Sequence, residues 1–241
     1  MSCYGGLMKK ILNNDLLNHY INEHNIESIF DKDILKYAQL HFYEKEEYIL
    51  KAESNLEYYY LIVDGKIKIS YPFENGKPML LKFYKDFNTI GDLEFLKNIP
   101  ILCDVDAVGD TYLIAIPSDI LRKKYLDNVK FLHHLIDSLS EKLYATINNS
   151  SYNFVYPLIN RLSSYLVEHI EDKNYIILNS SFLEIAQFLG TTYRHLNRTF
   201  KELESKSIIK CENKTIYILD ENRLRDLSKN FYINLYNIKI L

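Results

Sequence analysis

The chain is poor in several residue types, and each scarcity excludes a class of protein. Its 241 residues include no tryptophan, seven glycines and five prolines. So few glycines and prolines argue against long disordered segments. Three isolated cysteines, Cys3, Cys103 and Cys211, argue against a disulfide framework because their number is odd and their spacing wide. The length allows two domains, each with its own core.

Long apolar runs are also missing. No stretch approaches the roughly 20 apolar residues that a membrane span needs. The opening MSCYGGLMKKIL has no apolar core ahead of a small-residue cleavage site, so a secretory signal is not indicated. We therefore expect no membrane association and a cytoplasmic location.

A large net charge is absent as well, but the charges are unevenly spread. The formal net charge is −3. Residues 1–156 carry 17 basic and 22 acidic residues, whereas residues 157–241 carry 12 and 10. Between Gly190 and Thr215, six basic residues stand against three acidic ones. Because salt confines each exposed charge to roughly 10 Å, this local surplus matters more to a phosphate partner than the total does, and it favours nucleic-acid binding weakly.

The first 156 residues change from a helical to a strand pattern. The first 35 or so residues have helical spacing of apolar residues, whereas Tyr37 to Ile116 contains short β-branched and aromatic runs such as YYYLIVDGKIKISYPF. Asn75-Gly76 predicts a hairpin turn, and Gly65 a second tight turn. Several short strands at this spacing predict a β-sandwich or barrel-like roll. Ser118 is then a candidate N-cap for a helix.

A regular apolar seam follows the strands. Its residues are spaced 3, 4, 3 and 4 apart, which is the a/d pattern of a coiled coil over two heptads: Val129, Leu132, Ile136, Leu139 and Leu143. This favours a dimer seam; the alternative is a core helix lying on its own β-domain. The polar run Asn148–Asn153 breaks the pattern and predicts a hinge, after which Pro157 suits the first turn of another helix.

The segment from residue 181 to 205 predicts two helices joined by a short turn. Ser181 and Glu184 form a capping-box pattern, Gly190 ends the first helix, and Thr191 or Thr192 caps the second. If Leu196, Phe200 and Leu203 face inward, the donor-rich side chains are left to face outward: Tyr193, Arg194, His195, Asn197, Arg198 and Lys201. A major groove accepts one helix, and Arg and Asn make bidentate contacts to base edges.

A β-hairpin is predicted after the second helix. IIKCENKTIYIL alternates around a polar turn with Lys214 near its tip, and Asp220 is placed to cap a final helix. The ordered set of capped helix, Gly turn, cationic helix and hairpin is typical of a winged helix-turn-helix. The alternative is a helical domain with a solvated basic face.

With these elements in order, the chain resembles the CRP/FNR transcription regulators over nearly its whole length. EIAQFLGTTYRHLNRTFKELESKSII is similar to the family's helix-turn-helix signature, and YLIVDGKIKI and IGDLEFL are similar to its β-roll. GDLEFL and YRHL most resemble a branch named for the regulator YeiL. The resemblance implies an α+β protein with three parts: a cyclic-nucleotide-binding-like β-roll (a double-stranded β-helix) over residues 1–127, a dimerisation helix and hinge over 128–152, and a winged helix-turn-helix DNA-binding domain over 153–241.

The same resemblance implies a homodimer on a palindromic site in double-stranded DNA, with half-sites roughly 34 Å apart. The family's base-reading positions fall on Tyr193, Arg194 and Arg198. We expect Arg194 and Arg198 to contact bases or phosphates, with Tyr193 and Asn197 as the next candidates. The family often has Arg-Glu where this chain has Tyr193-Arg194, so the operator sequence is not carried over. Thr191, Thr192 and Lys214 are expected to contact the DNA backbone, and RNA polymerase is a further expected partner.

Departures from the family pattern bear on the effector pocket, for which the resemblance indicates Gly91, Asp92, Leu93, Leu102 and Cys103. Cyclic-AMP binders have Gly-Glu-Leu and, about ten residues later, an arginine that pairs with the cyclic phosphate. Here that arginine position falls on Leu102. Since a buried phosphate without a cationic partner is costly, we expect no response to cyclic AMP and an unknown small-molecule effector.

Cofactors and catalysis have little support in the sequence. Iron–sulfur members need four clustered cysteines, which three scattered ones do not supply, so no cluster and no other cofactor are expected. Cys103 is either a redox sensor or, as we favour, a small buried hydrophobe. No histidine pair has the i, i+4 spacing of a helical zinc site, and we expect no metal and no enzyme activity. Two alternative functions are a sensor module that acts through protein partners and a cupin-like metalloenzyme.

Overall fold

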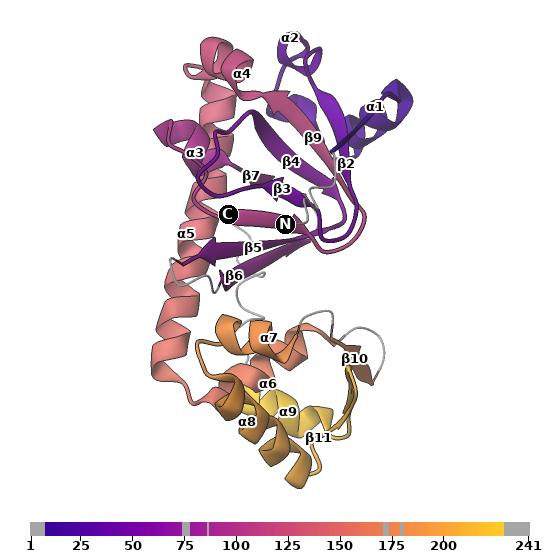
Figure 1. The fold of residues 1–241 in the computed structure, drawn as a ribbon, viewed down its shortest axis with the longest axis vertical. Helices are drawn as coiled ribbons and strands as arrows, with labels where there is room; N and C mark the ends of the chain where they lie inside the picture. The colour runs from indigo at the N-terminus through magenta and orange to yellow at the C-terminus, as the bar shows by residue number, and fades with distance from the viewer. Residues whose placement is uncertain (1–7, 74–77, 86, 171–173, 179–180, 229–241) are drawn as a thin grey trace, which may run out of the picture. The chain divides into compact units, whose positions relative to one another are not determined.

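The computed structural model describes residues 8–73, 78–85, 87–170, 174–178 and 181–228, and for residues 148–154 the backbone alone. The chain divides into two compact units, Met1–Lys142 and Leu143–Leu241 (Figure 1). Among the described residues, no helix is long and apolar enough to cross a membrane.

The first unit contains two antiparallel sheets, which confirms the predicted roll. One sheet has five strands in the order β1 (Lys9–Ile11), β2 (Gln39–Tyr43), β9 (Thr111–Pro117), β4 (Tyr58–Asp64) and β7 (Asn88–Ile90). The other has β3 (Tyr48–Leu50), β8 (Asp104–Ala107), β5 (Lys66–Pro72) and β6 (Pro78–Lys85). The predicted Asn75-Gly76 turn lies outside the described residues, but β5 and β6 on either side of it pair antiparallel, with Pro72 opposite Pro78.

The apolar run in β4 is continuous because the strand is buried on both faces. Tyr59 and Leu61 point into one apolar cluster, and Tyr60 and Ile62 into another. Successive side chains of a strand point to opposite faces, so one uninterrupted run supplies both clusters. This is why YYYLIV reads as a strand without polar alternation.

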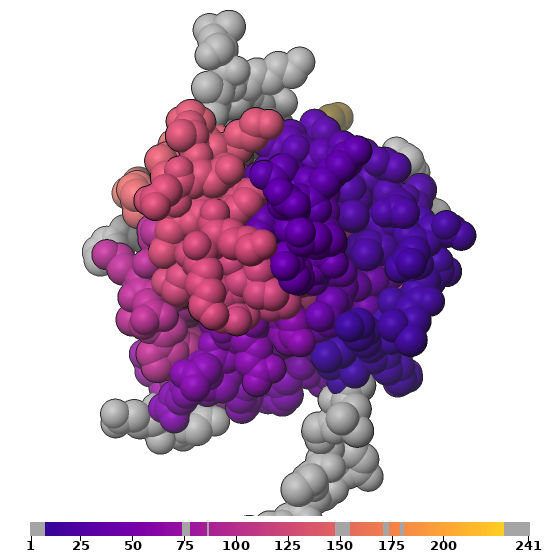
Figure 2. Space-filling model, turned by 90° about the horizontal axis from the view of Figure 1, so that it is seen from above, coloured from indigo at the N-terminus to yellow at the C-terminus, as the bar shows by residue number. Residues whose placement is uncertain are grey.

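Helices flank the strands of the roll (Figure 1). They are α1 (Asn14–Glu23), the short 3₁₀ helix η1 (Ile26–Ser28), α2 (Lys32–Leu35), α3 (Asp92–Lys97) and α4 (Ser118–Tyr125). Seen from above, the N-terminal segments in indigo lie beside the pink segment that contains α4 (Figure 2), and the Asp31 amide donates to the Tyr125 hydroxyl across this contact.

Two local expectations were wrong here. The N-terminal region is not helical throughout, because β1 precedes α1 and pairs with β2. Ser118 does not cap α4; it is the first helical residue, and its hydroxyl donates to the Leu56 carbonyl instead. A serine hydroxyl beside a loop carbonyl finds a partner there as readily as at a helix end.

The long helix α5 runs from Val129 to Val155 and has two apolar sides. Phe131 and Leu135 are buried against the roll. The predicted seam lies on another side: Val129, Ile136 and Leu143 are 64%, 58% and 61% exposed, and Leu132 and Leu139 are half-buried. The alternative of a helix packed on its own domain therefore describes one side of α5, and the seam pattern describes another.

The predicted break at Asn148–Asn153 is absent, because α5 continues as a helix through these residues. The helix ends two residues before Pro157, which is itself the N-cap of α6 (Leu158–Glu168). Asn and Ser are weak helix formers but do not prohibit a helix, whereas a proline disfavours helical backbone in the residue before it.

The second unit is a winged helix, as predicted. Besides α6 it contains α7 (Phe182–Phe188), α8 (Tyr193–Ser205) and α9 (Glu221–Ser228). Its sheet has the order β10 (Tyr175–Ile177), β12 (Thr215–Ile218) and β11 (Ile209–Glu212). The hairpin β11–β12 was predicted and β10 was not. Asp220 caps α9, since its Oδ1 accepts a hydrogen bond of 3.0 Å from the Arg223 amide.

The turn between β4 and β5 leaves no space for a side chain. Gly65 has a φ of +101°, and a Cβ atom there would lie 2.6 Å from the Asp110 carbonyl oxygen and 2.8 Å from the Thr111 Cα. Both neighbours are backbone atoms, so neither moves without disturbing β9. A Cβ added at Gly109, in contrast, would meet no atom within 4 Å.

We predict that Gly65→Ala lowers the free energy of unfolding of the first unit by roughly 2–4 kcal/mol, because left-handed backbone and overpacking both destabilise. The control Gly109→Ala should change it by less than about 0.5 kcal/mol. Urea denaturation followed by circular dichroism measures both variants. Equal stability of the two would show that the turn relaxes and would contradict this account.

Candidate nucleic-acid interface

The two helices α7 and α8 are joined by a turn whose geometry follows from local hydrogen bonds. The Glu184 amide donates to the Ser181 hydroxyl and the Ser181 amide to the Glu184 carboxylate, which is the predicted capping box. Gly190 has a φ of +59°, and the next amide, of Thr191, donates to the Ala186 carbonyl at 2.8 Å. Gly190 thus ends α7 in the left-handed conformation that favours glycine.

The second helix begins at a threonine cap. The Thr192 hydroxyl accepts a hydrogen bond of 3.2 Å from the His195 amide, so Thr192 rather than Thr191 is the N-cap of α8. The Thr191 hydroxyl lies 3.3 Å from His195 Nδ1. These bonds orient the first turn of α8 and place both hydroxyls at its N-terminus.

A buried arginine is hydrogen-bonded to the end of α7, where this turn begins. Arg161 of α6 is 8% exposed, and its Nη1 donates to the Leu189 carbonyl at the C-terminal end of α7. A cation beside the free carbonyls of a helix end is favourable. The α7–α8 turn is therefore fixed to α6 as well as to its own cap.

The inward side of α8 is as predicted. Leu196, Phe200 and Leu203 are buried in the core of the second unit, where the Phe200 ring packs edge-on against Phe182 with centroids 4.8 Å apart. Thr199 is also buried, and its hydroxyl donates to the His195 carbonyl. Burial of three large apolar side chains fixes which side of the helix faces solvent.

The outward side carries the donor-rich residues. Tyr193, Arg194, His195, Arg198 and Lys201 are exposed, and Asn197 is half-buried. They lie on one helix, which Figure 1 shows at the surface of the second unit. We call this set, from Tyr193 to Lys201, the α8 outer face.

The cations of the α8 outer face differ in their ion pairing from the other cations of this segment. Within the described part of the chain, no ion pair involves Arg194, Arg198 or Lys201. By contrast, Lys206 pairs with Glu202, and Lys210 pairs with Glu212. The local surplus of positive charge is thus concentrated on the outer face of α8 rather than spread along the segment.

The hairpin places a further exposed cation at its tip. The strands β11 and β12 pair from Ile209 opposite Ile218 to Glu212 opposite Thr215, which leaves Asn213 and Lys214 as the tip. Lys214 is exposed, and its carbonyl accepts from the Leu178 amide at 2.8 Å. The tip is therefore held by the short strand region that includes β10.

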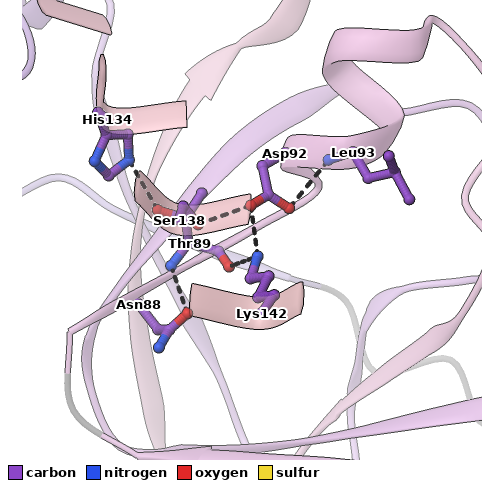
Figure 3. Close-up of polar contacts among 7 residues, drawn as sticks. All are labelled: Asn88, Thr89, Asp92, Leu93, His134, Ser138 and Lys142. Carbon is purple, nitrogen blue, oxygen red and sulfur yellow. Dashed lines mark hydrogen bonds and ion pairs between the residues drawn. The ribbon is translucent and has the colours of Figure 1, made fainter. Parts of the chain in front are cut away.

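The residues expected at an effector pocket lie around the start of α3. Gly91 has a φ of +83° and precedes the helix, while Leu93 and Leu102 are 38% and 42% exposed. The Leu102 amide donates to Glu94, which keeps the loop near α3. Asp92, however, is buried and turned toward α5, where it meets Ser138 and Lys142 (Figure 3).

The two cysteines of the described region have thiol pKa values above the ordinary range. Cys103 is half-buried, and burial together with Glu94 and Asp104 raises the pKa of its thiol to about 11. Its thiolate is therefore scarce at neutral pH, which agrees with a small hydrophobe better than with a redox sensor. Burial also raises the pKa of Cys211, to about 12, and Cys3 lies outside the described residues.

The contact between Asp92 and α5 was not predicted from the sequence. Phe131, Leu135, Ser138 and Lys142 are spaced 4, 3 and 4 apart, so a second stripe existed beside the seam. Two of its four members are polar, so a search for regularly spaced apolar residues does not find this stripe. A stripe of mixed polarity is visible only once its partner Asp92, nearly fifty residues earlier, is known.

Two family models match the chain, one on each unit. A cyclic nucleotide-binding domain matches residues 40–128, and a Crp-like helix-turn-helix domain matches residues 160–227. The first range covers most of the roll, and the second includes α7, α8 and the hairpin.

Curated relatives and solved structures agree with these models. The regulatory protein YeiL of Escherichia coli O157:H7 is 24% identical over 176 residues, covering 73% of this chain and 79% of its own length. A CRP-like cAMP-activated global transcriptional regulator of Mycobacterium tuberculosis is 22% identical over 172 residues, 68% of this chain and 77% of the relative. A solved structure from Eubacterium rectale, assigned to the CRP/FNR family, has a TM-score of 0.74 at 18% identity and covers 88% of this chain and 99% of that one.

The structural likeness, at such low identity, shows the shared fold. The family models and the curated relatives are those of transcription regulators. Since both models fall on the chain in the order of the roll and the winged helix, the chain belongs to the CRP/FNR family of transcription regulators.

Proposed function

We propose that the protein acts as a homodimer that binds a palindromic DNA site through the α8 outer face of each protomer, and that cyclic AMP is not its effector. The observation that carries this proposal is the division of α8 into a buried apolar side and an exposed cationic side. Its apolar residues are buried, and its cations face solvent without ion-pair partners among the described residues. A helix of this kind fits a major groove.

Arg194 and Arg198 are the proposed base-reading residues. They lie four residues apart, one turn along the exposed side, so both can reach one groove. An arginine fork makes two parallel hydrogen bonds to a guanine edge, whereas a lysine offers one point charge. Tyr193 and Asn197 are the next candidates, with His195 and Lys201 beside them.

Backbone contacts complete the proposed interface. The Thr191 and Thr192 hydroxyls stand at the N-terminus of α8, where amides and the helix dipole favour a phosphate. Lys214 at the hairpin tip supplies a further exposed cation. Such contacts set the register of the protein on DNA without reading sequence.

Dimerisation through α5 would present two such helices. The seam residues Val129, Ile136 and Leu143 are each more than half exposed, although large apolar side chains in a regular stripe normally find a partner. A second copy of the same helix is the partner that the a/d spacing fits. Twofold symmetry then calls for half-sites roughly 34 Å apart.

The proposed lack of a cyclic AMP response rests on two residues. Leu102 stands where cyclic AMP binders have the phosphate-pairing arginine, and it offers no charge. Asp92 has both carboxylate oxygens engaged by protein donors. We therefore propose that the effector is a different small molecule. The protein is proposed to act in the cytoplasm together with RNA polymerase. It is proposed to need no metal and no iron–sulfur cofactor.

For the DNA contact, Arg194→Ala should weaken binding roughly 5- to 150-fold, the equivalent of about 1–3 kcal/mol for one bidentate base contact. Arg194→Lys should recover little of the loss if the contact is to a base edge. Fluorescence anisotropy on fragments selected by the parent protein from random DNA measures both. Lys206→Ala, whose cation already pairs with Glu202, is the matched control.

The salt dependence of the same titrations separates DNA binding from a protein-partner function. Several phosphate contacts give a steep loss of affinity with rising salt, and removing one lowers the slope by about 1. A parent protein that selects no DNA, or an Arg194→Ala variant as tight as the parent, would contradict the assignment.

For the dimer, Ile136→Glu is expected to raise the dissociation constant at least roughly 100-fold, because an unpaired carboxylate buried in a seam costs about 3 kcal/mol or more. Lys130→Glu places the same group on an exposed, non-seam position of α5 and should leave the dimer intact. Analytical ultracentrifugation distinguishes the two. A monomeric parent, or a variant that still pairs, argues against the seam.

For the effector, cyclic AMP at millimolar concentration should not raise the melting temperature. A ligand present at about 100 times its Kd adds about 2.7 kcal/mol, which is a shift of several degrees and easily measured. Non-cyclic AMP serves as the control. A saturable rise with the cyclic nucleotide alone would overturn the reading of Leu102.

A further inference from the structure

The carboxylate of Asp92 is buried at the start of α3 and is bonded mainly to another element. The residue is 3% exposed. Its Oδ1 accepts from the Leu93 amide at 3.0 Å, and its Oδ2 accepts from the Ser138 hydroxyl at 2.7 Å and from Lys142 Nζ at 2.6 Å (Figure 3). Two of the three donors thus come from α5.

The same side of α5 also holds the end of β7. Lys142 Nζ donates to the Thr89 carbonyl at 2.9 Å, and the Thr89 hydroxyl lies 3.0 Å from His134 Nε2. His134, Ser138 and Lys142 are spaced four residues apart, so three successive turns of α5 contact one short segment (Figure 3). We call these five residues, Thr89, Asp92, His134, Ser138 and Lys142, the α5 polar cluster.

The cluster lies on a different side of α5 from the dimer seam. At 100° per residue, Ser138 and Lys142 point roughly 100–160° away from Ile136 and Leu143. Phe131 and Leu135 share the cluster's side and are buried in the roll. The cluster therefore fixes the rotation of α5 about its own axis, and that rotation decides how the seam is presented.

One ion pair dominates the cluster. Burial lowers the pKa of His134, so its ring is neutral at neutral pH and the fixed charges are those of Asp92 and Lys142. The two side chains are 5% and 24% exposed, which separates this pair from the exposed pairs elsewhere, such as Lys123 with Asp119 at 78% and 68%. Removing one partner of a buried pair leaves an uncompensated charge, which is far more costly than losing an exposed pair.

We propose that Asp92 and Lys142 are positioning residues: their ion pair holds α5 in the orientation in which its seam pairs with a second copy, and so sets DNA affinity from outside the DNA-binding unit. The proposal rests on the proposed function for its DNA readout. It assigns Asp92, within the segment expected to form the effector pocket, a mechanical role toward α5 rather than a contact with the effector.

The test compares Asp92→Asn with the matched control Asp119→Asn, which breaks the exposed pair on α4. We expect Asp92→Asn to weaken binding to the parent's selected DNA about tenfold, a usual size for coupling between sites, while Asp119→Asn binds as the parent does. Lys142→Met should resemble Asp92→Asn, and Lys142→Arg, which keeps the charge, should recover most of the affinity.

Hydrogen exchange supplies a readout that does not depend on DNA. In Asp92→Asn, amides of residues 132–142 should exchange at least about tenfold faster, with those of β4, β9 and α8 unchanged. Ser138→Ala, which removes one hydrogen bond and no charge, should show a smaller effect in the same segment. It keeps the test decisive if Asp92→Asn folds poorly.

Three results would overturn the proposal: a folded Asp92→Asn protein with the parent's DNA affinity and α5 exchange, faster exchange spread over the whole first unit, or a Lys142→Arg variant no better than Lys142→Met. If the parent protein binds no DNA, the proposed function fails instead, and the exchange data still decide whether the pair holds α5.

Discussion

The helix α5 is held against the roll on one side and exposed on another, and the proposed dimer depends on that division. Phe131 and Leu135 bury one side in the roll, and the buried ion pair of Asp92 and Lys142 completes the same contact. Because these contacts lie on one side of α5, the seam residues on another side remain exposed. Hydrophobic burial is not directional, whereas hydrogen bonds to a carboxylate are, so the polar part of the contact is what specifies the rotation of the helix.

Local chemistry made the winged helix predictable. The capping box at Ser181, the glycine after α7 and the apolar spacing of Leu196, Phe200 and Leu203 are all written within a few residues of the element they determine. The exposure of Arg194 and Arg198 then follows from helical geometry alone. The strands β4 and β5 and their turn at Gly65 were predictable for the same reason, since turn residues and strand periodicity are local signals, whereas the edge strand β1 was not predicted.

Features that depend on distant partners were not predictable. Whether Asp92 faces a pocket or a helix is decided by Ser138 and Lys142, which are 46 and 50 residues away. The strand β10 is only three residues long and is recognised by its pairing with β12. The polar run at Asn148–Asn153 misled because propensity is a weak preference, and a long helix that is already formed ahead of the run extends through it.

The separation of buried and exposed residues along α8 has a consequence for how such a regulator evolves. Side chains that hold the helix in its domain, among them Leu196 and Phe200, do not overlap with those that face solvent, among them Arg194 and Arg198. Exchange of an exposed residue alters what the surface recognises while the buried contacts persist. One scaffold can thus drift from one target to another through viable, fully folded ancestors.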